Sequence, residues 1–130
     1  MSDDAEKAIA DLVRTVELAD MVAYAGATWD WHRLHYDRDW VAAAGLTAPV
    51  VDGQALGALM AEHVLDHFGP RARLTALSVR YSAPVLAGET VRVSGTASRG
   101  RDGEVTVAQE VRVGERRCAH GRSVVRVGDG

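Results

Sequence analysis

An aspartate and a histidine stand five positions apart in a short segment crowded with tryptophan and histidine, as Asp30 and His35. One supplies a carboxylate and the other an imidazole, side chains that enzymes use to accept and deliver protons. The segment, residues 28–36, lies between two expected helices. A bend there would bring both groups onto one water molecule, so the pair predicts general acid–base chemistry on a bound water.

A glycine at the start of an uncharged stretch offers a hydrogen-bond donor that complements this pair. Gly53 opens residues 53–61, which carry no charge, and an expected helix continues from it to about residue 67. The first amides of a helix lack intrahelical partners and lie at the positive end of the helix dipole. We therefore expect the Gly53 amide, with added contacts from Gln54, to bind an oxygen that gains negative charge.

The pattern of the whole chain predicts one α+β domain over residues 1–130. We expect a frayed helix over the first dozen residues, a strand at 12–18, helices at 19–27 and 39–44, and the long helix, which Gly69 and Pro70 end. Further strands are expected at 73–81, 89–98, 105–113 and 117–127, with a hairpin turn at 101–103. The apolar stretch 53–61 predicts a helix enclosed on most sides by consecutive antiparallel strands.

The segment around the acid–base pair resembles the signature of the MaoC-like (R)-specific enoyl-CoA hydratases and 3-hydroxyacyl-thioester dehydratases. The signature's aromatic, hydroxyl, acidic, aliphatic and imidazole positions are matched by Tyr24, Thr28, Asp30, Leu34 and His35. Residues 50–53 resemble the family's segment before its central helix, and residues 82–91 resemble its strand–turn–strand. The resemblance extends from about residue 15 to residue 127.

Three positions depart from the family's pattern. Trp29 stands where Gly is usual, His32-Arg33 replaces Asn-Pro, and Asp52 replaces the His before Gly53. The form Asp-x-His-Arg-x-His is similar to a branch that contains mitochondrial 3-hydroxyacyl-thioester dehydratases and mesaconyl-CoA hydratases.

The resemblance implies a hotdog fold, in which an antiparallel sheet wraps around a long central helix. It also implies interconversion of trans-2-enoyl and (R)-3-hydroxyacyl thioesters of CoA or acyl carrier protein, with Asp30 and His35 as the catalytic pair and with no cofactor or metal. Candidates for the wall of the acyl pocket are Trp29, Trp31, Trp40 and Leu56. The tryptophans fit a second interpretation equally well, as apolar anchors of the loop.

Other functions fit the sequence less well. A hotdog thioesterase would need a carboxylate on the central helix facing the thioester, and residues 53–61 carry none. A non-catalytic partner subunit of a heteromeric hydratase would have no use for both Asp30 and His35. His63 and His67 are one helical turn apart, but no third metal ligand accompanies them in the sequence.

Composition and charge set the remaining expectations. The formal net charge is −3 with no block of like charge, which speaks against a nucleic-acid partner. Cys118 is the only cysteine, so the chain forms no disulfide within itself. Residues 1–7 lack the features of a signal peptide, and no apolar run is long enough to span a membrane. We expect a cytoplasmic homodimer, or a heteromer with another hotdog subunit.

Overall fold

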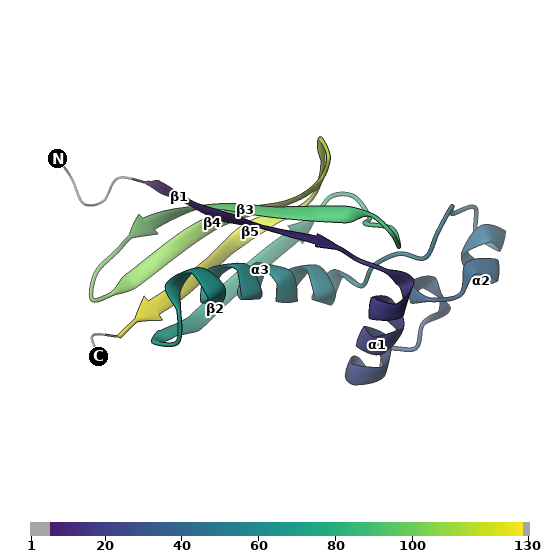
Figure 1. Cartoon of the computed structure of the whole chain (residues 1–130), viewed down its shortest axis with the longest axis horizontal. Coiled ribbons are helices and arrows are strands. Elements are labelled where there is room, and N and C mark those ends of the chain that lie inside the picture. The colour runs from purple at the N-terminus through teal and green to yellow at the C-terminus, as the bar shows by residue number, and fades with distance from the viewer. Residues whose placement is uncertain (1–5, 129–130) are drawn as a thin grey trace.

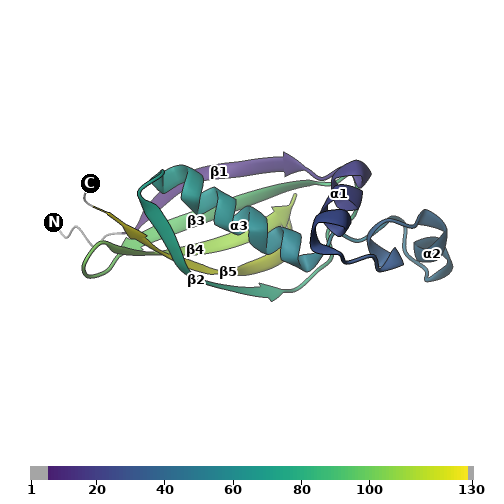
Figure 2. The ribbon, with the colours of Figure 1, turned by 90° about the horizontal axis from the view of Figure 1, so that it is seen from below.

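One long helix lies in the hollow of an antiparallel sheet (Figure 1). The computed structural model describes residues 6–128. Its elements in chain order are β1 (Lys7–Thr15), α1 (Leu18–Thr28), the 3-10 helix η1 (Arg33–His35), α2 (Arg38–Ala43), α3 (Gly53–Phe68), β2 (Ala72–Tyr81), β3 (Thr90–Arg99), β4 (Glu104–Val113) and β5 (Arg116–Val127). α3 crosses the sheet diagonally, whereas α1 and α2 lie beyond one end of it (Figure 2). The predicted architecture of a sheet wrapped on one central helix is confirmed.

The central helix α3 has the predicted bounds because both of its ends are chemically defined. At the start, the Asp52 side chain accepts a hydrogen bond from the Gln54 amide at 3.0 Å, which caps the helix. At the end, Gly69 adopts φ 85°, a conformation that glycine reaches without strain. The helix is less enclosed than expected, because Gln54 and Ala58 are exposed. One face of α3 therefore stays open beside the sheet.

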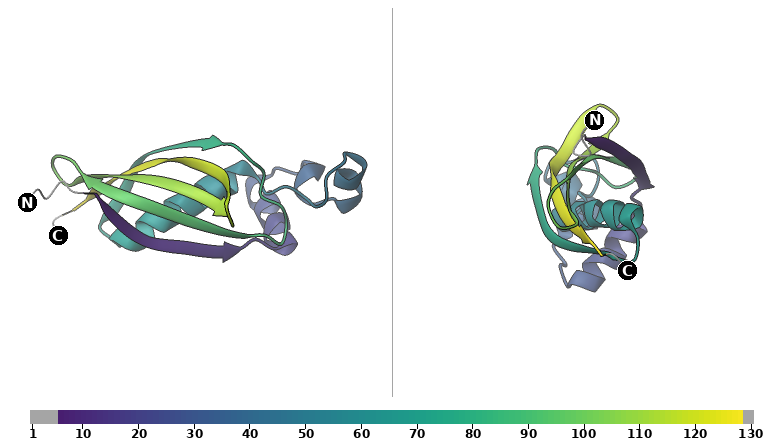
Figure 3. Two further views of the ribbon diagram at one scale, coloured as in Figure 1. Left: turned by 90° about the horizontal axis from the view of Figure 1, so that it is seen from above. Right: turned by 90° about the vertical axis from the view of Figure 1, so that its left-hand side faces the viewer.

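The sheet has five strands in the order β1-β3-β4-β5-β2, and every neighbouring pair is antiparallel. The predicted hairpin between β3 and β4 is confirmed, with Asp102 and Gly103 at φ 55° and 76°. The expectation of consecutive neighbours is wrong for β2, which pairs with β5 at the far edge. α3 carries the chain across the concave face before β2 begins, and the sheet curls around it in the end-on view (Figure 3).

The first strand corrects an expectation. The described chain is strand from Lys7 onward, so a helix over the first dozen residues is wrong there; residues 1–5 lie outside the described residues. The pairing of β1 with β3 shifts register between Ile9 and Leu12, as in a β-bulge. A bulge changes which side chains face inward, so Ile9 and Leu12 both pack against the core although three positions separate them. Residues three positions apart also share one face of a helix, which is why the sequence pattern suggested a helix here.

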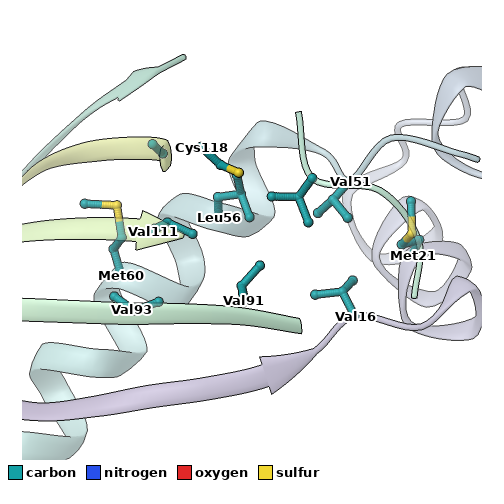
Figure 4. Close-up of a cluster of buried hydrophobic side chains, with 11 residues drawn as sticks. Val16, Met21, Val51, Leu56, Met60, Val91, Val93, Val111 and Cys118 are labelled. Atoms are coloured by element: carbon teal, nitrogen blue, oxygen red, sulfur yellow. The ribbon is translucent and has the colours of Figure 1, made fainter. Parts of the chain in front are cut away.

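The core consists of two apolar clusters on the sheet-facing side of α3. One surrounds Leu56 and Met60 near the start of the helix (Figure 4), and the other surrounds Val64 near its end. Met60 and Val64 are fully buried, and burying such side chains stabilises the fold by about 1.5–3 kcal/mol each. Within residues 6–128, no helix combines the length and apolar character needed to cross a membrane.

A buried polar network lies at the junction of the two clusters. The His63 ring, only 3% exposed, places Nε2 2.9 Å from the carbonyl of Ala10 in the β1 bulge. A carbonyl can only accept, so Nε2 carries the proton and Nδ1 accepts from the Gln109 side-chain amide at 2.9 Å. Gln109 also donates to the Met60 carbonyl and accepts from Ser123. Every member is satisfied while His63 is neutral.

Candidate active site

The loop that carries Asp30 begins at a left-handed turn. Trp29 caps α1 at φ 59°, and the next amide, that of Asp30, donates to the Ala25 carbonyl at 3.0 Å. This turn stops the helix and sends the chain into η1. A left-handed residue here explains why glycine suits the corresponding place in the family's signature, since glycine adopts that conformation at little cost.

The tryptophans pack against one another and against other residues of this region. Trp29 is 81% exposed and meets Trp31 edge to face, with ring centroids 6.1 Å apart. Trp31 in turn contacts the Tyr36 ring, and Trp40 contacts His32. The structure therefore does not place Trp29, Trp31 or Trp40 on the groove described below, and the fourth candidate, Leu56, is buried in the core.

His35 is held by a backbone carbonyl on the neighbouring segment. Its Nδ1 lies 2.8 Å from the Val50 carbonyl, which can only accept, so Nδ1 carries the proton. Nε2, on the other side of the ring, is then the nitrogen that faces the rest of the cluster. That atom lies 3.6 Å from Oδ2 of Asp30 and 3.8 Å from Oδ2 of Asp52. The structure thus brings Asp30 and His35 together and adds a second carboxylate.

Asp52 is the residue that sequence reasoning did not assign to the site. Its Oδ1 caps α3, while its Oδ2 is buried without a hydrogen-bond partner. One ligand atom from each of Asp30, His35 and Asp52 can be chosen so that all lie within 4.8 Å of one another. A single water molecule or a cation could contact all three. The sequence did contain a signal, because an Asp before Gly53 is unusual for the family. The orientation of the Asp52 side chain, however, is seen only in the fold.

The charges of this cluster act on its ionisable neighbours. The pKa of Asp30 lies below its ordinary value, first because of the neighbouring Asp52 side chain and then because of the His32 amide and the charge of His35. Asp30 is therefore a carboxylate near neutral pH and can accept a proton. Burial, followed by the charge of Asp52, raises the pKa of the phenols of Tyr24 and Tyr81.

An apolar groove of about 280 Å³ leads from this cluster along the open face of α3. Its apolar lining comes from α1, α3 and the segments before them, and consists of Val16, Met21, Tyr24, Ala25, Val51, Ala55, Ala58 and Leu59. At the other end Arg14 and Glu62 form an ion pair through both terminal nitrogens of the guanidinium. A polar cluster joined to an apolar groove suits a ligand with a reactive head and an apolar tail.

The start of α3 offers fewer free donors than expected. The Gln54 amide already donates to Asp52, and the Gln54 side chain is exposed. The Gly53 amide, the first of the helix, has no acceptor within the helix. A Cβ at Gly53 would lie 3.1 Å from the Tyr81 ring, so the close packing of that ring favours glycine there.

Fold and site together define a hotdog domain with an acid–base cluster beside its central helix. The MaoC like domain matches residues 4–117, so the chain belongs to the MaoC-like family of hydratases and dehydratases, and the predicted resemblance is confirmed. Identity is 33% over 87 residues with the beta subunit of 3-oxo-4,17-pregnadiene-20-carboxyl-CoA hydratase from Mycobacterium tuberculosis, covering 67% of each protein. Peroxisomal multifunctional enzyme type 2 from Mus musculus is 35% identical over 65 residues, 48% of this chain and 9% of that enzyme.

Solved structures share the fold over nearly the whole chain. A chain of the ChsH1-ChsH2 complex from Mycobacterium tuberculosis superposes with a TM-score of 0.89 at 24% identity, covering 98% of this chain and 100% of that one. The (R)-hydratase from A. caviae involved in PHA biosynthesis gives 0.87 at 20% identity, covering 98% of both chains. These likenesses confirm the predicted hotdog fold.

Proposed function

We propose that this chain catalyses the reversible addition of water to a trans-2-enoyl thioester, giving a 3-hydroxyacyl thioester. The observation that carries the proposal is the 3.6 Å approach of His35 Nε2 to the Asp30 carboxylate at the mouth of an apolar groove. Membership of the MaoC-like family supports the reaction class.

The reaction needs a base for water, a proton for C2 and a donor for the thioester oxygen. Ionised Asp30 takes a proton from water as the water oxygen forms its bond to C3, while Nε2 of His35, in the imidazolium form, donates a hydrogen bond to that oxygen. The C2–C3 π electrons move toward the thioester carbonyl, whose oxygen gains charge that the Gly53 amide stabilises. Asp30 then returns the proton to C2, so that one water has been added and the carboxylate is restored.

The groove supports a fatty acyl or similar apolar group on the thioester. Its apolar walls would hold the tail, and the cluster of Asp30 and His35 would act on carbons two and three. The family resemblance is the reason for proposing the (R) configuration of the product. It also gives CoA or acyl carrier protein as the carrier. The mycobacterial relative's name, a CoA hydratase subunit, favours CoA.

The test is direct. Purified protein is mixed with trans-2-enoyl-CoA substrates of increasing chain length, the loss of enoyl absorbance is followed, and the product is resolved on a chiral column. We expect turnover to the (R)-3-hydroxyacyl-CoA. Absence of turnover on every CoA and carrier-protein thioester would contradict the proposal, and an (S) product would overturn the assigned face of attack.

A specific observation bears on each of two alternatives. A thioesterase needs a carboxylate on the helix at the thioester, but the first acid on α3 is Glu62, which pairs with Arg14 at the far end of the groove. A partner subunit of a heteromer is favoured by the likeness to a subunit of a two-component complex. Activity of this chain by itself would separate that role from an enzyme that carries its own site.

A further inference from the structure

Asp52 has one carboxylate oxygen more than its structural task requires. Capping of α3 uses Oδ1 alone, through the Gln54 amide. Ser and Asn cap helices about as well as Asp and need no second oxygen. Oδ2 is nevertheless buried and without a partner, which is a costly state for a carboxylate oxygen. Capping therefore does not explain the choice of Asp at this position.

The free oxygen faces the proposed proton-handling pair. Oδ2 of Asp52 lies 3.8 Å from Nε2 of His35, whose other neighbour is Asp30 at 3.6 Å. Both separations are too long for direct hydrogen bonds, which span about 2.7–3.2 Å. Ligand atoms of the three residues lie within 4.8 Å of one another. A triangle of that size leaves a point at about 2.8 Å from all three corners, which is the place of a single water oxygen.

We propose that Asp52 is a positioning residue for the reaction: its buried Oδ2 accepts one hydrogen of the water, Asp30 accepts the other, and the Nε2–H of His35 donates to the water oxygen. The inference rests on the proposed function, in which that water is the nucleophile. With three contacts the water has one defined orientation, and its remaining lone pair is aimed at the substrate carbon. The Asp52 side chain is also the first cause of the lowered pKa of Asp30, which agrees with two carboxyls that act at one place.

The experiment separates this role from helix capping. Asp52→Ser keeps a capping oxygen but cannot reach the water, and Asp52→Asn keeps both the cap and a polar group of nearly the same shape. Asp37→Ser is the matched control, because Asp37 caps α2 through the Trp40 amide at 3.0 Å and lies outside the cluster. Steady-state kinetics and melting temperature are measured for the three variants and the wild type.

We expect Asp52→Ser to lower kcat by at least about tenfold with KM within about threefold, at a melting temperature close to that of the wild type. Asp52→Asn should recover part of this loss, and Asp37→Ser should keep the wild-type kcat. If wild type is active and Asp52→Ser stays within about threefold of its kcat, the inference is overturned while the proposed function stands.

A second measurement keeps the inference testable without turnover. The carboxyl of Asp30 is titrated by carbon-13 NMR in wild type and in Asp52→Ser. Loss of the Asp52 side chain, the first cause of the lowered pKa, should move the Asp30 midpoint to higher pH, toward the ordinary value of 3.8. An unchanged midpoint would show that the two carboxyls are independent and would overturn the inference even for a protein that turns over no thioester.

Discussion

Nε2 of His35 lies 3.6 Å from Oδ2 of Asp30, although the two residues belong to different local structures. Asp30 follows the left-handed turn at Trp29, whereas His35 ends η1 and is anchored by the Val50 carbonyl. Each orientation has its own cause, so either side chain can be replaced without removing the support of the other. This independence makes substitution of the pair informative.

Replacing either member of the pair should abolish most of the activity. We expect Asp30→Asn and His35→Ala each to lower turnover by about 10²–10⁴-fold, the usual contribution of a general acid or base. Because both act on one water, the double variant should lose much less than the product of the single losses. Turnover is measured together with the melting temperature, which should change little.

His32→Ala is the control for that experiment. His32 stands in the same loop, but its Nδ1 accepts from the Leu34 amide at 3.0 Å and so serves η1. We expect a smaller loss that accompanies a lower melting temperature. If Asp30→Asn stays within about threefold of wild type, or if only His32→Ala is inactive, the assignment of the pair is wrong.

The length of the acyl group should depend on the open face of α3. Ala58 is exposed and lines the groove, about 7.5 Å along the helix axis from Gly53. Ala58→Trp should therefore lower kcat/KM for long enoyl chains while leaving a four-carbon substrate nearly unaffected. Asp66→Trp is the control, since Asp66 is exposed on the same helix outside the groove. Equal loss for all chain lengths would show that the tail does not follow this path.

Stability should fall on mild acidification because of His63. Burial lowers the pKa of His63 below the ordinary 6.5, an effect that His67 adds to and that the Ala10 carbonyl, Asp11 and Asp66 oppose. Below pH 6.5 His63 is protonated in the unfolded chain but stays neutral in the folded state until a lower pH. The free energy of unfolding therefore decreases as pH falls. The slope approaches about 1.4 kcal/mol per pH unit for one proton, and above that pH this contribution is fully retained.

Urea unfolding at several pH values measures this slope. His63→Gln removes the ionisable group and should make the free energy of unfolding less dependent on pH. His67→Gln, at an exposed position, should not change that dependence. A slope in His63→Gln equal to that of wild type would assign the acid sensitivity to other groups.

The edge strand β2 is where we expect a second hotdog chain to join. It exposes the apolar side chains Leu77 and Tyr81, at 36% and 54%, and an unpaired strand edge is prone to pair with another strand. Sedimentation should give a dimer at micromolar concentration, and Leu77→Lys should shift it toward monomer. Val13→Lys, on the opposite edge strand β1, should not. A monomeric wild type would contradict the homodimer, and assembly with a different hotdog subunit would then be the remaining expectation.

Local chemistry allowed much of the fold to be predicted from the sequence. The bounds of α3 follow from a capping Asp52 and from Gly69, and the β3–β4 hairpin follows from Asp102 and Gly103; each depends on a few neighbouring residues. The meeting of Asp30 and His35 was predictable for the same reason, since a short loop joins them.

Tertiary structure decided the features that depend on distant contacts. The spacing of Ile9 and Leu12 imitates a helix, but pairing with β3 and a bulge make it a strand. Trp29 and Trp31 contact each other and Trp40 contacts His32, and the groove is lined by side chains of α1, α3 and the segments before them, an arrangement that depends on distant contacts. Whether Asp52 merely caps a helix or also faces His35 depends on how α3 docks against that loop, which no spacing in the sequence encodes.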